Sequence, residues 1–141
     1  MSRRSQILDA LATKLALMDG VNYTSNIFNN ISKKMLFPDA LPDYPYLCMS
    51  AGTEKREYLP ANFKWGWLSI VIRVYVQEEE TLPALEPFLE DIEAILDANN
   101  ELEYATDSYV REIMIDQIST DEGLLAPLGI GEIKILVRYD L

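Results

Sequence analysis

The side chains best suited to catalysis in this sequence are carboxylates, because its 141 residues include no histidine. Without histidine the chain cannot form a Ser-His-Asp triad, a Cys-His pair or a histidine metal site. The densest acidic cluster is Glu78–Glu80, and Glu112 and Asp116 share one face of a predicted strand. Groups of this kind could bind magnesium in a nuclease.

These carboxylates also have a simpler interpretation as solvated positions. The run Glu78–Glu80 lies between a predicted strand and a predicted helix, where acidic residues favour the helix N-terminus. Glu112 and Asp116 occupy the polar side of a half-buried strand, and Gly129–Gly131 leads into a strand rather than a helix, unlike a phosphate-binding loop. We therefore expect a protein that is not an enzyme and has no metal ion or cofactor.

Cysteine usage and charge exclude further classes. The single cysteine, Cys48, rules out a disulfide within the chain, and its apolar surroundings suit a thiol packed as a small hydrophobic group. The net charge of -11 argues against a nucleic-acid groove or an anionic membrane surface, since both require basic residues. It is compatible with the wall of a channel through which DNA slides.

Length and hydropathy indicate one globular unit. A chain of 141 residues with 49% hydrophobic and 25% charged residues is typical of a single domain, here expected to span 1–141. The apolar runs are too short to span a bilayer, and no stretch of signal-peptide length follows the N-terminus. We expect the protein to be made in a cytoplasm and to have no membrane partner.

Two segments have the periodicity of amphipathic helices. The first is predicted from near Ser5 to about Met18, with apolar residues at helical spacing and Gly20 as its stop. The second follows Thr81 as N-cap, with Pro83 in its first turn, and ends near 99–100.

Alternating apolar residues predict the strands. The clearest is Trp65–Gln77, and the others are Val21–Phe28, Tyr46–Ala51, Val110–Thr120 and a final strand at 133–139. The segment Asn29–Pro45 is expected to be irregular because it contains three prolines. The predicted fold class is α+β: a single, mainly antiparallel or mixed sheet, two amphipathic helices packed on it, and a long β-hairpin loop.

That hairpin loop is the polar segment Gly52–Lys64, which joins two predicted strands. Loops longer than about 12 residues are uncommon in compact domains and often functional. The segment is either a solvated hairpin tip or an arm that reaches a partner.

The main strand is apolar on both faces. Trp65, Trp67, Val71 and Tyr75 lie opposite its predicted core face, together with Arg73. A sheet with two apolar faces must be covered on both. Either the irregular segment or a neighbouring subunit could supply the cover, and aromatic residues with arginine favour interfaces. Trp65, Trp67, Arg73 and Tyr75 are therefore candidates for a subunit interface.

The order of these elements resembles the tail terminator proteins of long-tailed phages, the family of the lambda minor tail protein U. The segments that carry the resemblance are the helix end Met18–Val21, the proline-bounded approach to a strand at Leu41–Met49, the charged segment Glu54–Pro60, the long strand Trp67–Val76, and the final strand Ile133–Tyr139. They span nearly the whole chain.

The resemblance implies a structural virion protein at the head-proximal end of the tail. It implies a hexameric ring that caps the tail tube, stops tube polymerisation and offers a joining surface to head-completion proteins, with DNA passing through its lumen. By analogy the hairpin loop faces the tube or the lumen, and its candidate contact residues are Glu54, Lys55, Arg56, Glu57 and Tyr58. Sheet edges and the irregular segment would meet neighbouring subunits.

Three alternatives remain open at this point. The chain could be another neck component, such as a tail-completion or head-completion protein. It could be a carboxylate-dependent metal nuclease, or a monomeric regulatory protein.

Overall fold

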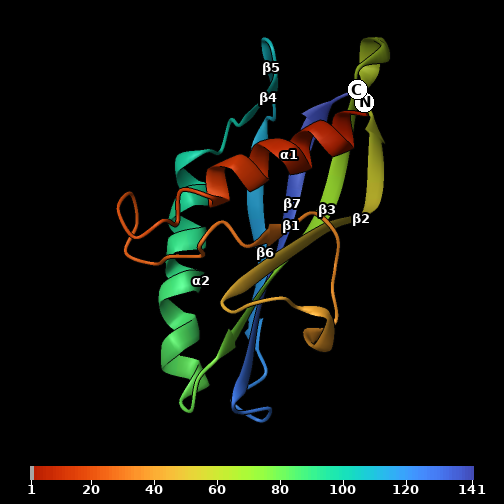
Figure 1. Cartoon of the computed structure of the whole chain (residues 1–141). Helices are drawn as coiled ribbons and strands as arrows, with labels where there is room; N and C mark the ends of the chain where they lie inside the picture. The colour runs from red at the N-terminus through yellow and green to blue at the C-terminus, as the bar shows by residue number, and fades with distance from the viewer. Residues whose placement is uncertain (1) are drawn as a thin grey trace.

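The computed structural model describes residues 2–141 and contains a five-stranded sheet with strand order β1-β2-β3-β7-β6 (Figure 1). Its strands are β1 (Ile31–Ser32), β2 (Tyr46–Tyr58), β3 (Lys64–Gln77), β6 (Glu112–Thr120) and β7 (Leu128–Asp140). β1 pairs with β2 in parallel, and every other neighbouring pair is antiparallel. The predicted α+β class with a mainly antiparallel, mixed sheet is confirmed.

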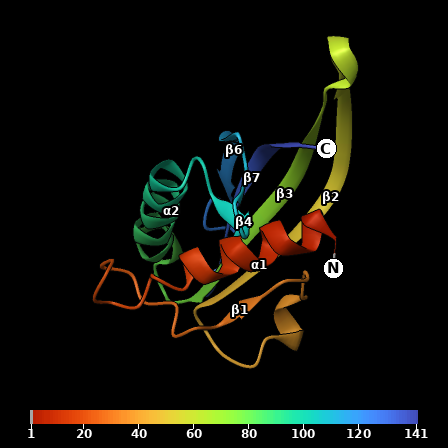
Figure 2. The same ribbon diagram turned by 90° about the horizontal axis from the view of Figure 1, so that it is seen from above.

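Both helices, α1 (Arg3–Leu15) and α2 (Thr81–Ala98), lie on the same face of the sheet (Figures 1 and 2). α1 begins two residues before the predicted start because the Ser2 side chain accepts a hydrogen bond from the Ser5 amide. α2 has Glu80, not Thr81, as its N-cap, and Thr81 is instead buried in the first turn.

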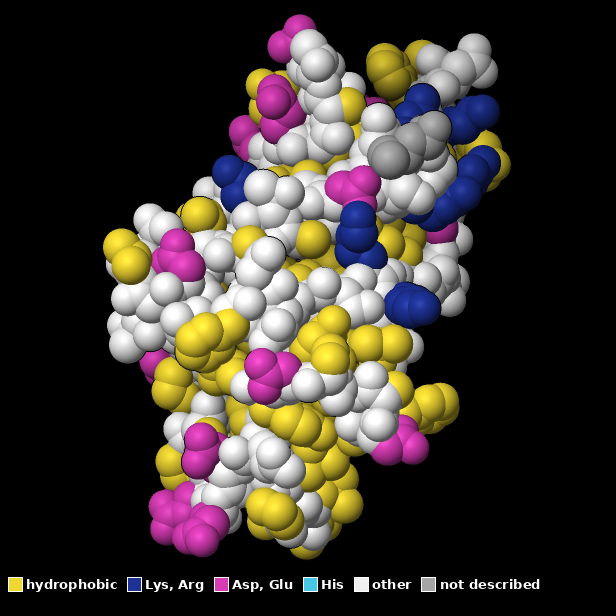
Figure 3. All heavy atoms as spheres, in the orientation of Figure 1, with side chains coloured by type: hydrophobic (Ala, Val, Ile, Leu, Met, Phe, Trp, Pro, Cys, Tyr) yellow, Lys and Arg dark blue, Asp and Glu magenta, His cyan; other side chains and the backbone are white. Residues whose placement is uncertain are grey.

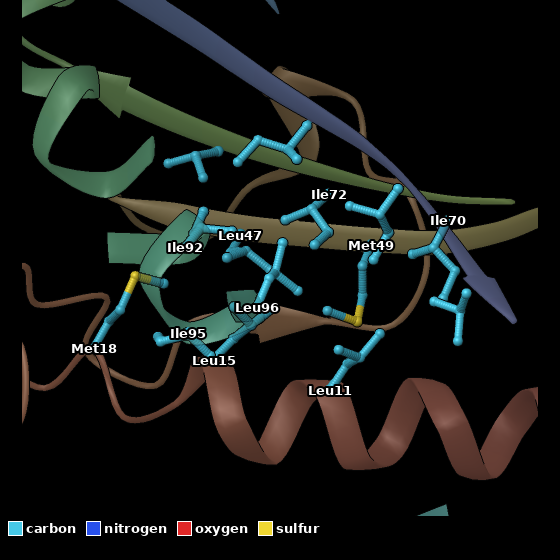
Figure 4. Close-up of a cluster of buried hydrophobic side chains, with 14 of the residues drawn as sticks. Leu11, Leu15, Met18, Leu47, Met49, Ile70, Ile72, Ile92, Ile95 and Leu96 are labelled. Atoms are coloured by element: carbon cyan, nitrogen blue, oxygen red, sulfur yellow. The ribbon is translucent and has the colours of Figure 1, made fainter. Parts of the chain in front are cut away.

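The core lies between these helices and the sheet (Figure 4). Side chains of both helices meet alternate residues of the strands, and all of them are almost fully buried: Leu11, Leu15, Leu47, Met49, Ile70, Ile72, Ile92, Ile95, Leu96, Ile133 and Ile135. The apolar residues at helical spacing and those that alternate along the strands therefore pack together in a single apolar layer. None of the helices within residues 2–141 is long and apolar enough to cross a membrane.

The predicted strand Val21–Phe28 is wrong. The Asp19 carboxylate accepts hydrogen bonds from the amides of Val21 and Asn22, which turns the chain immediately after α1. The side chains of Val21 and Phe28 are 88% and 64% exposed, and only an isolated bridge joins Asp19 to Asn26.

The predicted loop Gly52–Lys64 is a β-hairpin arm. β2 continues through Gly52 with a bulge between Ala51 and Glu54, and it pairs with β3 as far as Tyr58. A tight turn with a short 3-10 helix (Pro60–Asn62) joins the two strands, and the arm projects beyond the helices (Figure 2). Strand pairing therefore orders most of this segment as a continuation of β2.

A second, smaller hairpin follows α2. It consists of β4 (Glu103–Ala105) and β5 (Ser108–Tyr109), which were not predicted because each is too short to show alternation. β6 consequently begins at Glu112, two residues later than predicted.

The start of α2 packs closely on β7 because Gly129 has no side chain. A Cβ atom at Gly129 would lie 2.7 Å from the Thr81 Cβ and 2.8 Å from the Val76 Cγ2. Both neighbours are branched at Cβ and cannot rotate away cheaply. This glycine fixes the distance between α2 and the sheet.

We predict that Gly129→Ala lowers the free energy of unfolding by about 1–3 kcal/mol, as overpacking of a core does. Gly52→Ala is the matched control, because the nearest atom to its Cβ is the Ser69 carbonyl oxygen at 3.9 Å. Chemical denaturation of both variants measures the effect. Equal stability of the two would contradict this account of the contact.

Candidate assembly surface

The face of the sheet opposite α1 and α2, which we call the open face, is covered by neither of these two helices (Figure 2). Its residues alternate with core residues along β3 and β7 and are mostly half-buried: Trp65, Trp67, Ser69, Val71, Arg73, Glu132, Lys134, Leu136 and Arg138. The open face is therefore an amphipathic surface rather than a fully solvated one.

An aromatic and arginine cluster marks the arm end of the open face. The Arg138 guanidinium carbon lies 3.9 Å from the ring centroid of Trp65 and 5.6 Å from that of Trp67. Arg138 also forms an ion pair with Glu112, with 3.3 Å between Nε and Oε1. The Trp67 indole donates to the Glu57 carboxylate at 3.1 Å. These contacts hold both tryptophans in fixed orientations while leaving them partly exposed.

The opposite end of the open face is covered by the irregular segment. Tyr75 is 1% exposed, and its hydroxyl donates to the Leu36 carbonyl at 3.1 Å. Arg73 donates to Glu132 through Nε and Nη2, at 3.0 and 2.6 Å. Of the two covers considered, the irregular segment Asn29–Pro45 is the one that lies over Tyr75, and it closes this residue to a neighbour.

Beside Trp67 the open face is hollowed by a groove of about 390 Å³. Thr53, Lys55, Trp67, Asp116 and Leu136 are among its lining residues. Its floor is apolar and its rim carries charges of both signs. Such a groove suits a side chain of a protein partner better than a small polar ligand.

The arm is held on the body through Glu54. Its carboxylate accepts hydrogen bonds from Arg4 at 3.3 Å, from Arg56 at 3.2 Å and from the Tyr139 hydroxyl. Only 10% of the Glu54 side chain is exposed, so this candidate contact residue holds the arm in place instead of facing a partner. The other four candidates, Lys55, Arg56, Glu57 and Tyr58, are exposed along the arm.

The charge states of this cluster are fixed by its contacts. Burial raises the pKa of Glu54, but hydrogen bonds from Tyr139 and Arg56 and the charge of Arg4 outweigh it and hold the pKa below 4.5. Burial and the hydrogen bond to Glu54 raise the pKa of Tyr139 to about 12. Sequence reasoning missed this cluster because Glu54 and Tyr139 are 85 residues apart.

Both edges of the sheet are open for most of their length. β1 pairs only with Leu47 and Cys48, so the outer side of β2 is free beyond that point. β6 is the other edge strand, and it has a bulge between Ile115 and Gln117. Free edges of this kind can pair with another chain.

The carboxylates considered for catalysis are not gathered together. Glu78–Glu80 are exposed, Glu112 is engaged by Arg138, and Asp116 lines the groove. Residues 2–141 contain no group of three His, Cys, Asp or Glu side chains that could hold a metal ion. Cys48 is buried, as its packing role requires.

Comparison with known proteins identifies relatives over the full length. A family model described as bacteriophage tail tube terminator protein matches residues 1–141. The tail tube terminator protein p142 of Escherichia phage T5 is 32% identical, over 99% of this chain and 94% of that protein. Among solved structures, a chain from the virion of a native gene transfer agent particle has the same fold. Its TM-score is 0.65 at 12% identity, covering 96% of this chain and 95% of that one.

We predict that Glu54→Gln lowers the free energy of unfolding at neutral pH by about 1–3 kcal/mol, because it removes a charged hydrogen-bond acceptor. The pKa of Glu54 is lower in the folded state, so its contribution is present above about pH 4.5 and disappears as pH falls through the folded pKa. The pKa of Tyr139 is raised, so its contribution is present below pH 10 and disappears as pH rises toward 12.

Denaturation curves at a series of pH values measure how the free energy of unfolding falls on acidification, which we call the acid limb, and how it falls at high pH. The variant should lose less stability on acidification than the parent chain does. Glu90→Gln, an exposed position on α2, is the control and should keep the parent's acid limb. An unchanged acid limb in Glu54→Gln would show that this cluster does not fasten the arm.

Proposed function

This chain belongs to the bacteriophage tail tube terminator family, and we propose that it acts as one copy of a hexameric ring that caps the tail tube. The match of the family model to all 141 residues carries the assignment, and the identity of 32% to a tail tube terminator protein supports it. In this role the ring stops tube polymerisation at the head-proximal end of the tail. The role is structural and uses no catalytic site.

The two free sheet edges support a ring of identical copies. β2 and β6 run in opposite directions, since each neighbouring pair from β2 to β6 is antiparallel. Lys55 on β2 and Glu112 on β6 lie in one row across the sheet, with Trp67 and Arg138 between them. The two free edges therefore lie at the same height along the strand direction. A second copy in the same orientation can therefore place its β2 antiparallel to this β6.

The distribution of charge supports a head-to-tail contact as well. Residues 1–73 contain nine Lys or Arg against six Asp or Glu, whereas residues 74–141 contain three against 17. In a cyclic ring each copy meets its neighbours through two different surfaces. The half of the chain that contains β2 is therefore net positive and the half that contains β6 strongly acidic, a difference that favours contact between β2 of one copy and β6 of the next.

We assign different partners to the two ends of the sheet. The arm, with the exposed residues Lys55, Arg56, Glu57 and Tyr58, faces the tail tube or the lumen. The opposite end carries the exposed Leu82 and the loop residues Leu124 and Leu125, and faces a head-completion protein. Genomic DNA passes through the lumen without base recognition, as suits a chain of net charge -11.

We assign the open face to a subunit interface through Trp65, Trp67 and Arg73. Both tryptophans are partly exposed in the single chain, which leaves apolar area for a neighbour to cover. Tyr75 supports this surface from beneath, because the irregular segment covers it. Assembly would take place in the host cytoplasm before the tail joins the head.

We predict a discrete oligomer of about 97 kDa for six copies of the 16.1 kDa chain, alone or with tube protein. Light-scattering chromatography gives the mass, and electron microscopy should show rings of uniform diameter. With growing tubes, the protein should cap their ends and stop elongation. A strict monomer that neither binds nor caps tubes would disprove the proposal.

We also predict that tryptophan fluorescence shifts to shorter wavelength when rings form, because both tryptophans of the chain lie on the open face. Burial by a neighbour removes water from the indole rings. The emission of Trp65→Phe and Trp67→Phe variants assigns the shift to each position. Rings that form without any shift would show that the open face is not an interface.

A further inference from the structure

One flank of the arm is basic and aromatic. Glu54, Arg56 and Tyr58 lie on the side of β2 that faces the same way as the two helices. Lys64 pairs with Tyr58 across the hairpin. The Lys64 ammonium lies 5.8 Å from the Tyr58 ring centroid, and Tyr58 is 69% exposed. Arg4 and Arg56 share the single carboxylate of Glu54. We call Arg4, Arg56, Tyr58 and Lys64 the basic flank. Its three positive charges exceed the one negative charge of Glu54, so the net charge here is positive.

The hairpin β4–β5 is acidic and also carries an aromatic residue. Glu101, Glu103 and Asp107 are all exposed, and the Tyr109 side chain is 49% exposed. The adjacent Arg111 is already bound to a β7 carboxylate, with Nε 3.0 Å from Asp140 Oδ2. In Figure 3 acidic side chains gather over this hairpin, and basic side chains gather over the arm and the start of α1.

These two surfaces lie at the same end of the molecule but at opposite edges of the sheet. Figure 1 shows the arm and the β4–β5 hairpin projecting in the same direction. The hairpin leads into β6, one edge strand, while the arm is the end of β2, at the other edge. Within residues 2–141 of a single copy, no hydrogen bond or ion pair joins the arm to this hairpin.

A neighbouring copy removes this separation. When β6 of one copy lies beside β2 of the next, the β4–β5 hairpin of the first copy comes level with the arm of the second. Opposite charges and exposed aromatic rings then face each other, as interfaces favour.

We propose that the basic flank of the arm on one copy binds the acidic β4–β5 hairpin of the next copy. This inference rests on the proposed ring and names a contact within it. Tyr58 packs against Tyr109, while Arg56 and Lys64 face Glu101 and Glu103. In this contact Arg56 and Tyr58 bind the neighbouring copy, whereas Lys55 and Glu57 on the other side of the arm and the turn Pro60–Asn62 stay free for the tube or the lumen.

Charge reversal tests the contact under conditions in which the parent chain forms rings. Arm variant Arg56→Glu with Lys64→Glu, and hairpin variant Glu101→Lys with Glu103→Lys, each place like charges together in a ring of their own. Each should raise the concentration at half-assembly by about tenfold or more. Mixed in equal amounts they should restore rings when copies alternate. The acidic arm of one variant then meets the basic hairpin of the other, and the remaining contacts keep the parent pairing of a basic arm with an acidic hairpin.

Matched controls change the same charge elsewhere. Lys14→Glu with Lys34→Glu reverses two other lysines, and Glu90→Lys with Glu93→Lys reverses two carboxylates on α2. Both control variants should assemble as the parent does. Recovery of rings in the mixture also demonstrates that the reversed variants fold.

The outcomes separate this contact from the proposed function. Parent rings together with normal assembly of each reversed variant would overturn the contact and leave the ring intact. Loss of assembly without rescue in the mixture would also overturn it. Absence of parent rings with and without tube protein would overturn the ring and the contact together.

Discussion

The architecture depends on one buried apolar layer, in which α1 and α2 pack against a single face of the sheet. Leu11 and Ile92 from the helices and Ile70 and Ile133 from the strands are at most 1% exposed within it. Because both helices are used on this face, the chain has only one irregular segment for the other. A small domain that buries one face well leaves a second face half-covered, and that surface is available for assembly.

The arm extends past this apolar layer and needs another means of support. Glu54 supplies it by accepting from Tyr139, Arg4 and Arg56, so polar contacts replace burial where the core ends. Gly66 allows the Tyr139 ring to lie against the arm, since a Cβ there would be 3.0 Å from the ring. Hydrogen bonds are directional, so they fix the angle of the arm as well as its position.

The sequence predicts the parts of the fold that periodicity controls. The alternation from Leu68 to Val76 places β3, and apolar spacing places both helices, because burial of one side imposes those periods. The predicted strand Val21–Phe28 is absent because the turn at Asp19 outweighs the weak alternation of this segment. The predicted end of β2 at Ala51 is too early because a bulge lets the strand continue past Gly52. The Glu54–Tyr139 contact depends on distant segments, which local patterns do not report.

One bulge lies in the part of β2 whose outer side is not paired with β1, and the other lies in the edge strand β6. A bulge bends a strand and increases its twist, so these two positions set the direction in which each edge leaves the sheet. If copies join along these edges, the angle between successive copies is determined there, and that angle determines how many copies close a circle. Subunit number would then be a property of local strand curvature rather than of contact strength.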